Sequence, residues 1–149
     1  MFRGQFVHNI DAKGRVSVPV RFREALLSDG CTRFVLTPDV FDPCLHLHPM
    51  REWERFEEQI AALPSLDPHV VRFRRLYVSA AVECELDRAG RMLVPPHLRD
   101  RADLTKEILF AGTGRKIEVW SKARWDDAVA MTSDDFEAFK QAVMEQIRI

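Results

Sequence analysis

Two short segments place cationic side chains on tight turns, an arrangement that can bind phosphate groups. Residues 11–15 read Asp-Ala-Lys-Gly-Arg, and residues 87–91 read Asp-Arg-Ala-Gly-Arg. A Lys or Arg on a rigid turn can reach the phosphates of a nucleic acid or the edges of its bases. The alternative is an ordinary turn in which each Asp forms an ion pair with its Arg. A single D-x-x-G-R motif is too common to decide between the two.

The two segments belong to a repeat, which favours the nucleic-acid interpretation. Residues 11–19 and 87–95 share the pattern D-x-x-G-R-x-x-V-P at an offset of 76 positions, which is 87 minus 11. A unit present only twice predicts two pseudo-symmetric halves that complete one core, not a stacked solenoid. We expect a first half-unit at 1–64, a connecting helix at 65–81, and a second half-unit with a C-terminal helix at 82–149.

Alternating apolar and polar residues on both sides of each turn, at 5–10 and 15–18 in the first half, predict a β-hairpin in each half. The Asp side chain that begins each turn can accept backbone N–H groups, and the Gly can adopt a positive φ. We therefore expect four residues to shape the turns: Asp11, Gly14, Asp87 and Gly90.

Each hairpin is followed by a proline that ends its second strand. Pro19 and Pro95 can each occupy the first turn of a short helix. Further short strands are predicted at 34–37, 44–48, 108–111 and 116–120. A longer helix is predicted to begin just after Pro49 and to stop at Pro64. A second is predicted to start at Asp67-Pro68, and a third is predicted to have Ser133 as its N-terminal cap. These elements predict a mainly β fold with peripheral helices.

The net charge of −1 does not exclude a nucleic-acid-binding protein, because clustered cations bind phosphates whatever the total charge. Residues 1–23 carry five Lys and Arg against one Asp, which gives +4. Residues 126–149 carry six acidic residues against two basic ones, which gives −4. No segment is apolar enough to cross a bilayer and no signal-peptide core is present, so we expect a cytoplasmic protein without membrane contact.

Other motifs give weaker indications of function. Cys44, His46 and His48 alternate along one predicted strand and could bind a metal on a shared face, but a half-buried strand without metal is the simpler interpretation. The basic residues at 72–75 favour a solvated or interface face of a helix over a second phosphate-binding stripe. No P-loop, G-x-S-x-G or G-x-G-x-x-G motif is present. We expect no enzyme activity, cofactor or small-molecule substrate.

The residues resemble those of the MraZ family of bacterial transcriptional regulators. Phe2-Arg3-Gly4 and residues 8–19 look like the start of these proteins, and Glu85-Leu-Asp87 and Ile117-Glu-Val-Trp120 match in the second half. The resemblance covers nearly all 149 residues. It implies a double-split (swapped-hairpin) AbrB-like β-barrel formed by two pseudo-symmetric repeats. It also implies a ring-shaped homo-oligomer that binds double-stranded DNA at direct repeats in the promoter of its own division and cell-wall operon.

The D-x-x-x-R motif of that family falls on Asp11 with Arg15 and on Asp87 with Arg91. Because Lys13 faces Ala in the second copy, we expect the first hairpin to be the principal DNA contact and Arg91 to serve structure or assembly. The full set of expected DNA-binding residues is Arg3, Lys13, Arg15, Arg88 and Arg91. A DNA-binding role also implies association with the nucleoid.

A second hypothesis is an AbrB-type protein-interaction module, similar to an antitoxin, without a specific promoter function. In that case the acidic C-terminal helix would bind the partner protein.

Overall fold

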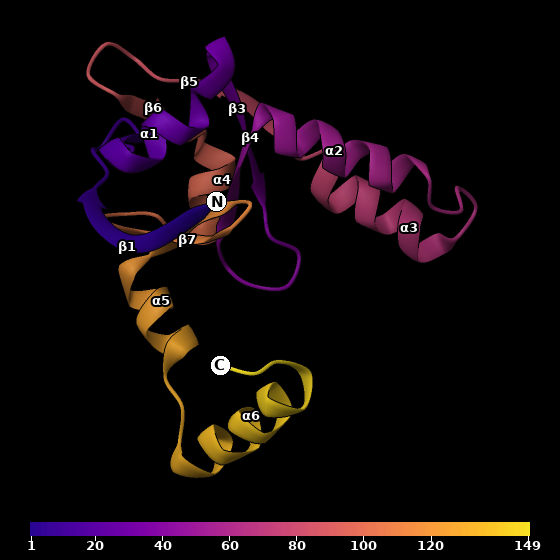
Figure 1. Cartoon of the computed structure of the whole chain (residues 1–149). Coiled ribbons are helices and arrows are strands. Elements are labelled where there is room, and N and C mark those ends of the chain that lie inside the picture. Colours follow the sequence, from indigo (N-terminus) through magenta and orange to yellow (C-terminus); the bar gives the residue numbers. More distant parts are fainter.

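The computed structural model describes the backbone of residues 1–149 and every side chain except that of Asp29. Strands form the body of the molecule, and helices lie around it (Figure 1). The first repeat contains β1 (Phe2–Asn9), β2 (Arg15–Ser17), α1 (Val20–Leu26), η1 (Ser28–Gly30), β3 (Arg33–Pro38), β4 (Leu45–Pro49) and α2 (Met50–Ala61). Between the repeats, α3 (Pro68–Phe73) continues into the π-helical segment η2 (Arg74–Val78). The second repeat contains β5 (Val82–Glu85), β6 (Arg91–Leu93), α4 (Pro96–Ala102), β7 (Glu107–Gly114), β8 (Ile117–Ser121), α5 (Lys122–Val129) and α6 (Ser133–Gln146).

The strands of the two repeats are intertwined. A six-stranded antiparallel sheet has the order β1-β7-β8-β4-β3-β5, and β2 pairs with β6 in a separate two-stranded ribbon. If each of the strands β1–β4 is exchanged with its counterpart among β5–β8, the same strand order results, read from the opposite edge of the sheet. A pseudo-twofold axis therefore passes between β4 and β8 and between β2 and β6. The prediction of a mainly β fold with peripheral helices and two pseudo-symmetric, swapped repeats is confirmed, and the six-stranded sheet itself is not closed into a continuous barrel.

One apolar core lies between the sheet, the ribbon and helices α1 and α4. The ribbon contributes Val16 and Met92, and the helices contribute Phe22 and Leu98, all of them at most 2% exposed. Each pair is separated by the 76-residue offset of the repeat, so equivalent positions pack in the same core. Burial of each such side chain contributes about 1.5–3 kcal/mol to folding. Both repeats are therefore needed to build this core.

Two aromatic clusters cover the outer face of the sheet. Trp53 of α2 and Tyr77 of η2 pack on Val35 of β3. At the equivalent place in the second repeat, Trp120 of β8 packs against Trp125 of α5, with ring centroids 5.7 Å apart. The helices after β4 and β8 thus bury their apolar faces on the sheet, as amphipathic helices do.

Helix α6 lies apart from the body, beyond α5 (Figure 1). The side chain of Thr132 caps its N-terminus by accepting the N–H of Asp135 at 3.2 Å. Phe136 and Phe139 are 49% and 48% exposed, so the apolar side of α6 has no cover within this chain. Among the described residues, no helix combines the length and apolarity that a membrane span requires.

The observed bounds differ from the predicted ones in informative ways. β1 begins at Phe2, because its pairing with β7 extends as far as Gly114. α2 ends at Ala61, short of the predicted stop at Pro64. The cap of α6 is Thr132 and not Ser133. Long-range pairing, which no local pattern encodes, accounts for the first difference.

Candidate nucleic-acid interface

Four of the five cations predicted to bind DNA lie on one structure, which we call the cross-repeat ribbon: β2 paired with β6, together with the turns at 11–14 and 87–90. Arg15 stands opposite Leu93, and Arg91 lies two positions before Leu93 on the same strand. Because side chains alternate between the two faces of a strand, Arg15 and Arg91 share the outer face. The residues between them in each strand point into the core.

The first turn is organised by the side chain of Asp11. Its Oδ1 accepts the backbone N–H groups of Lys13 at 3.0 Å and Arg15 at 2.9 Å, and its Oδ2 accepts the Nε–H of Arg15 at 2.7 Å. Gly14 closes the turn with a φ of +87°, a conformation that favours glycine. The carbonyl of Gly14 accepts the N–H of Val94 at 2.8 Å, which fixes the turn to the end of β6.

The second turn repeats this geometry. Asp87 accepts the N–H groups of Ala89 and Arg91, each at 2.9 Å, and the Nε–H of Arg91 at 2.9 Å. Gly90 has a φ of +76°, and its carbonyl accepts the N–H of Val18 at 3.0 Å. The ion pair of an ordinary turn is therefore present in both copies. It uses only the Nε of each arginine, so the terminal nitrogens have no ion-pair or hydrogen-bond partner among the described residues.

The electrostatics of the turns favour ionised aspartates. The pKa of Asp11 lies below its usual value, chiefly because its carboxylate accepts the backbone N–H of Arg15 and also pairs with the guanidinium of that residue. The pKa of Asp87 is lowered for the same reasons by Arg91. Both arginine side chains remain 35% exposed. Such solvent-exposed ion pairs contribute little stability, so their main effect is to orient the guanidinium groups.

Two further arginines, which sequence analysis did not single out, lie against the turns. A Cβ atom at Gly14 would lie 2.7 Å from Nε of Arg99, and Arg23 occupies the equivalent place against Gly90. Each arginine comes from the short helix of the other repeat, and its Nε is buried without a hydrogen-bond partner in the described structure. Both residues come four positions after the repeated Val-Pro, so the repeat alignment contained the signal.

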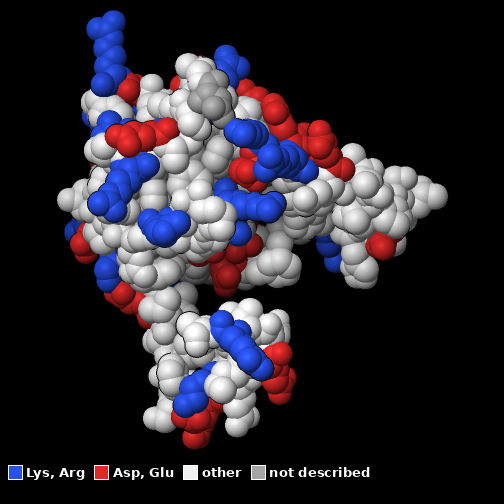
Figure 2. Space-filling view, in the orientation of Figure 1, with Lys and Arg blue, Asp and Glu red and all other residues white. Residues whose placement is uncertain are grey.

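The remaining predicted cations are divided between two places. Lys13 and Arg88 are exposed on the two turns, at opposite ends of the ribbon. Arg3 lies opposite Thr113, near the start of β1. From there β1 runs six residue steps to Asn9, or about 20 Å at a strand rise of about 3.4 Å. The structure therefore does not bring Arg3 to the turn. Figure 2 shows positive and acidic side chains interspersed over the body of the molecule, with a row of acidic side chains along α2.

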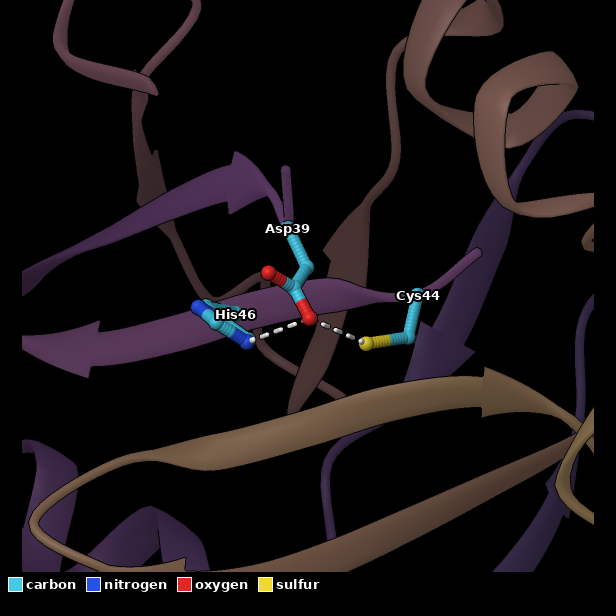
Figure 3. Close-up of side chains that lie close together, drawn as sticks. All are labelled: Asp39, Cys44 and His46. Atoms are coloured by element: carbon cyan, nitrogen blue, oxygen red, sulfur yellow. Dashed lines mark hydrogen bonds and ion pairs between the residues drawn. The ribbon is translucent and has the colours of Figure 1, made fainter. Parts of the chain in front are cut away.

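The histidines of β4 lie in a polar cluster on the outer face of the sheet. Nδ1 of His46 and Nε2 of His48 each lie 2.8 Å from the hydroxyl of Tyr77. Burial lowers the pKa of His46 to about 4 and that of His48 to about 3, so both rings are neutral at pH 7. His48 does not converge with Cys44 and His46. Asp39, which sequence analysis did not consider, takes that place (Figure 3).

Comparison with known proteins finds one family that matches this chain twice. One family model, described as "MraZ protein, putative antitoxin-like", matches residues 1–76 and again residues 77–146. A transcriptional regulator MraZ from Escherichia fergusonii is 40% identical over 148 residues, 99% of this chain and 97% of the relative. Its counterpart in Escherichia coli strain K12 is 44% identical over 129 residues, 87% and 85% of the two chains. That of Klebsiella pneumoniae strain 342 is 41% identical over 145 residues, 97% and 93%. With two family matches and full-length relatives, this chain belongs to the MraZ family.

Proposed function

We propose that this chain is a sequence-specific transcriptional regulator that binds double-stranded DNA with the outer face of the cross-repeat ribbon. The observation that carries this proposal is the placement of Arg15 and Arg91 on one exposed face, as diagonal neighbours across β2 and β6. Such neighbours are about 7–8 Å apart. The names of the relatives, which are transcriptional regulators, support the same function.

The dimensions of the ribbon suit the major groove. That groove is about 12 Å wide and admits a two-stranded β-ribbon. Arg15 and Arg91 would present their terminal guanidinium nitrogens to base edges, where guanine offers two acceptors. Lys13 and Arg88, at the two ends, would contact phosphates. Because each aspartate already orients its arginine, less conformational entropy is lost on binding.

One ribbon makes few phosphate contacts, so we infer that several copies act together. The exposed apolar side of α6, with Phe136 and Phe139, is a surface through which chains could assemble into a ring. A ring presents several ribbons to one duplex, and direct repeats in the promoter would supply matching sites with increased avidity. We propose that the target is the promoter of the chain's own division and cell-wall operon.

The same proposal extends to the cellular location and the partners of the protein. It acts in the cytoplasm, associated with the nucleoid, and its partners are DNA and other copies of itself. It is not an enzyme and needs no small-molecule substrate for this function. The two half-units, at 1–64 and 82–149, contribute one turn each to the DNA-binding face.

The test is fluorescence anisotropy with a duplex taken from directly upstream of the coding region, over a series of salt concentrations. We expect Arg15→Gln and Arg91→Gln to keep the native circular dichroism spectrum. Each lost phosphate contact should reduce the slope of log affinity against log salt by about 0.9, and each lost base contact should cost about 1–3 kcal/mol of sequence discrimination.

A matched control is Arg72→Gln, since Arg72 is an exposed arginine on α3, which projects from the opposite side of the body (Figure 1). This variant should bind like the parent protein. If folded Arg15→Gln and Arg91→Gln both bound the duplex with unchanged affinity and salt slope, the ribbon would not be the DNA-binding face. Comparison of Lys13→Gln with Arg88→Gln tests whether the first turn is the principal contact.

A protein-interaction module is the second candidate, and the exposed apolar side of the acidic helix α6 favours it. In that case the α6 surface, and not the ribbon, would carry the function. The outcome that supports it is an absence of DNA binding at low salt for a chain that forms a defined complex with a second protein through α6.

A further inference from the structure

Three potential metal ligands converge on the outer face of the sheet. Asp39 follows β3, Cys44 precedes β4, and His46 lies within β4 (Figure 3). One ligand atom from each lies within 4.8 Å of the other two. The three residues are 6%, 1% and 8% exposed, so the point between them is screened from solvent.

Hydrogen bonding within the chain satisfies this cluster poorly. Oδ2 of Asp39 lies 3.7 Å from Sγ of Cys44 and 3.5 Å from Nε2 of His46. Its Oδ1 accepts the backbone N–H of Phe41 at 3.2 Å. A thiol is a weak donor, and a buried carboxylate is costly unless short, strong interactions compensate its charge. The spacing is too wide for a tight hydrogen-bonded triad.

The same spacing suits a tetrahedral metal ion. Zinc binds carboxylate oxygen at about 2.0–2.2 Å, imidazole nitrogen at about 2.0–2.1 Å and thiolate sulfur at about 2.3 Å. At tetrahedral angles these bond lengths place neighbouring ligand atoms about 3.3–3.6 Å apart. The two distances from Asp39 Oδ2, 3.5 and 3.7 Å, are close to those values. The third pair of ligand atoms, from Cys44 and His46, lies within 4.8 Å, and binding of the ion would bring these two atoms to the tetrahedral spacing.

The second ring nitrogen of His46 already has an orienting partner. Its Nδ1 lies 2.8 Å from the hydroxyl of Tyr77, which in turn lies 2.8 Å from Nε2 of His48. If Nδ1 of His46 donates to this hydroxyl and the hydroxyl donates to His48, the lone pair of His46 Nε2 faces the cluster. Metal-binding histidines are usually fixed in this way by a hydrogen bond at the other nitrogen.

The cluster is not required by the hairpin that carries it. In the second repeat, β7 and β8 form the equivalent hairpin, with Arg115 and Lys116 between the strands. The residue opposite His46 across the pseudo-twofold axis is Glu118, which accepts a hydrogen bond from Trp120. The same supersecondary structure therefore forms without an Asp, Cys and His set. A purely structural role does not explain why only the first repeat has one.

We propose that Asp39, Cys44 and His46 form a binding site for zinc or a similar divalent transition-metal ion, with water as the fourth ligand. The sulfur and imidazole ligands select against Mg²⁺ and Ca²⁺, which prefer oxygen. On binding, the Cys44 thiol releases one proton to solvent, and the resulting thiolate and the Asp39 carboxylate balance the two charges of the ion. The bound ion fixes the β3–β4 turn to the sheet. This site is separate from the DNA-binding ribbon.

The test uses the full chain, reduced and freed of metal with a chelator, and titrated with Co²⁺. We expect one Co²⁺ per chain, with a thiolate-to-cobalt charge-transfer band in the near ultraviolet and the strong visible bands of tetrahedral cobalt, both abolished by added Zn²⁺. Zn²⁺, but not Mg²⁺, should raise the melting temperature. If the parent chain shows no charge-transfer band, the proposal is wrong, whatever the variants do.

Variants of the cysteines assign the site. Cys44→Ser should lose the charge-transfer band, whereas the matched controls Cys31→Ser and Cys84→Ser should keep it. Asp39→Asn should weaken cobalt binding at least tenfold, which provides a second variant if Cys44→Ser does not fold. A band that persists in folded Cys44→Ser would place the metal elsewhere and overturn the assignment.

Discussion

Replacement of Gly14 by alanine tests how the first turn is positioned. At a φ of +87° an alanine is strained, and the left-handed region costs an L-residue about 1–2 kcal/mol. Its Cβ would also lie 2.8 Å from the carbonyl oxygen of Val94 and 2.7 Å from Nε of Arg99. The carbonyl group of Val94 cannot move away freely, because the N–H of the same residue is hydrogen-bonded to the carbonyl of Gly14. Overpacking of this kind adds about 1–3 kcal/mol, so we expect Gly14→Ala to cost about 2–5 kcal/mol in total.

The measurement is urea unfolding at one fixed protein concentration, followed by circular dichroism. Gly30→Ala is the control for backbone conformation alone, because Gly30 has a φ of +72° and nothing lies within 4 Å of its Cβ position. It should cost only about 1–2 kcal/mol. Gly90→Ala should fall between the two, because the atoms nearest its Cβ belong to the flexible side chain of Arg23. Equal costs for Gly14→Ala and Gly30→Ala would refute the packing argument.

Two further perturbations test the turn aspartates and the assembly surface. The pKa values of Asp11 and Asp87 are lowered in the folded chain. The two carboxylates therefore contribute to stability above the usual carboxyl pKa of about 3.9. This contribution is lost as the pH falls through the lowered pKa values of the folded chain. The double variant Asp11→Asn, Asp87→Asn should therefore lose less stability below about pH 4 in acid-unfolding curves, and an unchanged curve would count against these shifts. Phe136→Ser with Phe139→Ser should lower the mass measured by light scattering while leaving the melting temperature of the body unchanged; an unaltered mass would show that α6 does not mediate assembly.

Local chemistry determined most of what the sequence could predict. The turn glycines, the prolines before α1 and α4, and the amphipathic pattern of α2 each specify nearby backbone, and the repeat predicted the pseudo-symmetric halves. The positions of Arg3 and Asp39 depend instead on long-range pairing. Arg3 is close to the turn in sequence but far from it along the extended strand β1. Asp39 reaches Cys44 only because the β3–β4 hairpin brings the two residues together.

The contacts of the turn glycines explain why the repeats are intertwined at the proposed DNA-binding face. The carbonyl of Gly14 accepts a hydrogen bond from Val94, and Arg99 packs against Gly14, so residues of the second repeat hold the first turn in place. The first repeat holds the second turn in place through the equivalent contacts. Positions that face across the pseudo-twofold axis must therefore remain complementary. The exposed tips of the turns have no such constraint, and there the copies differ: Lys13 in the first turn corresponds to Ala89 in the second. Duplication within one chain thus preserves a common scaffold for the ribbon, while the exposed residues at the tips of the two turns can differ between the repeats.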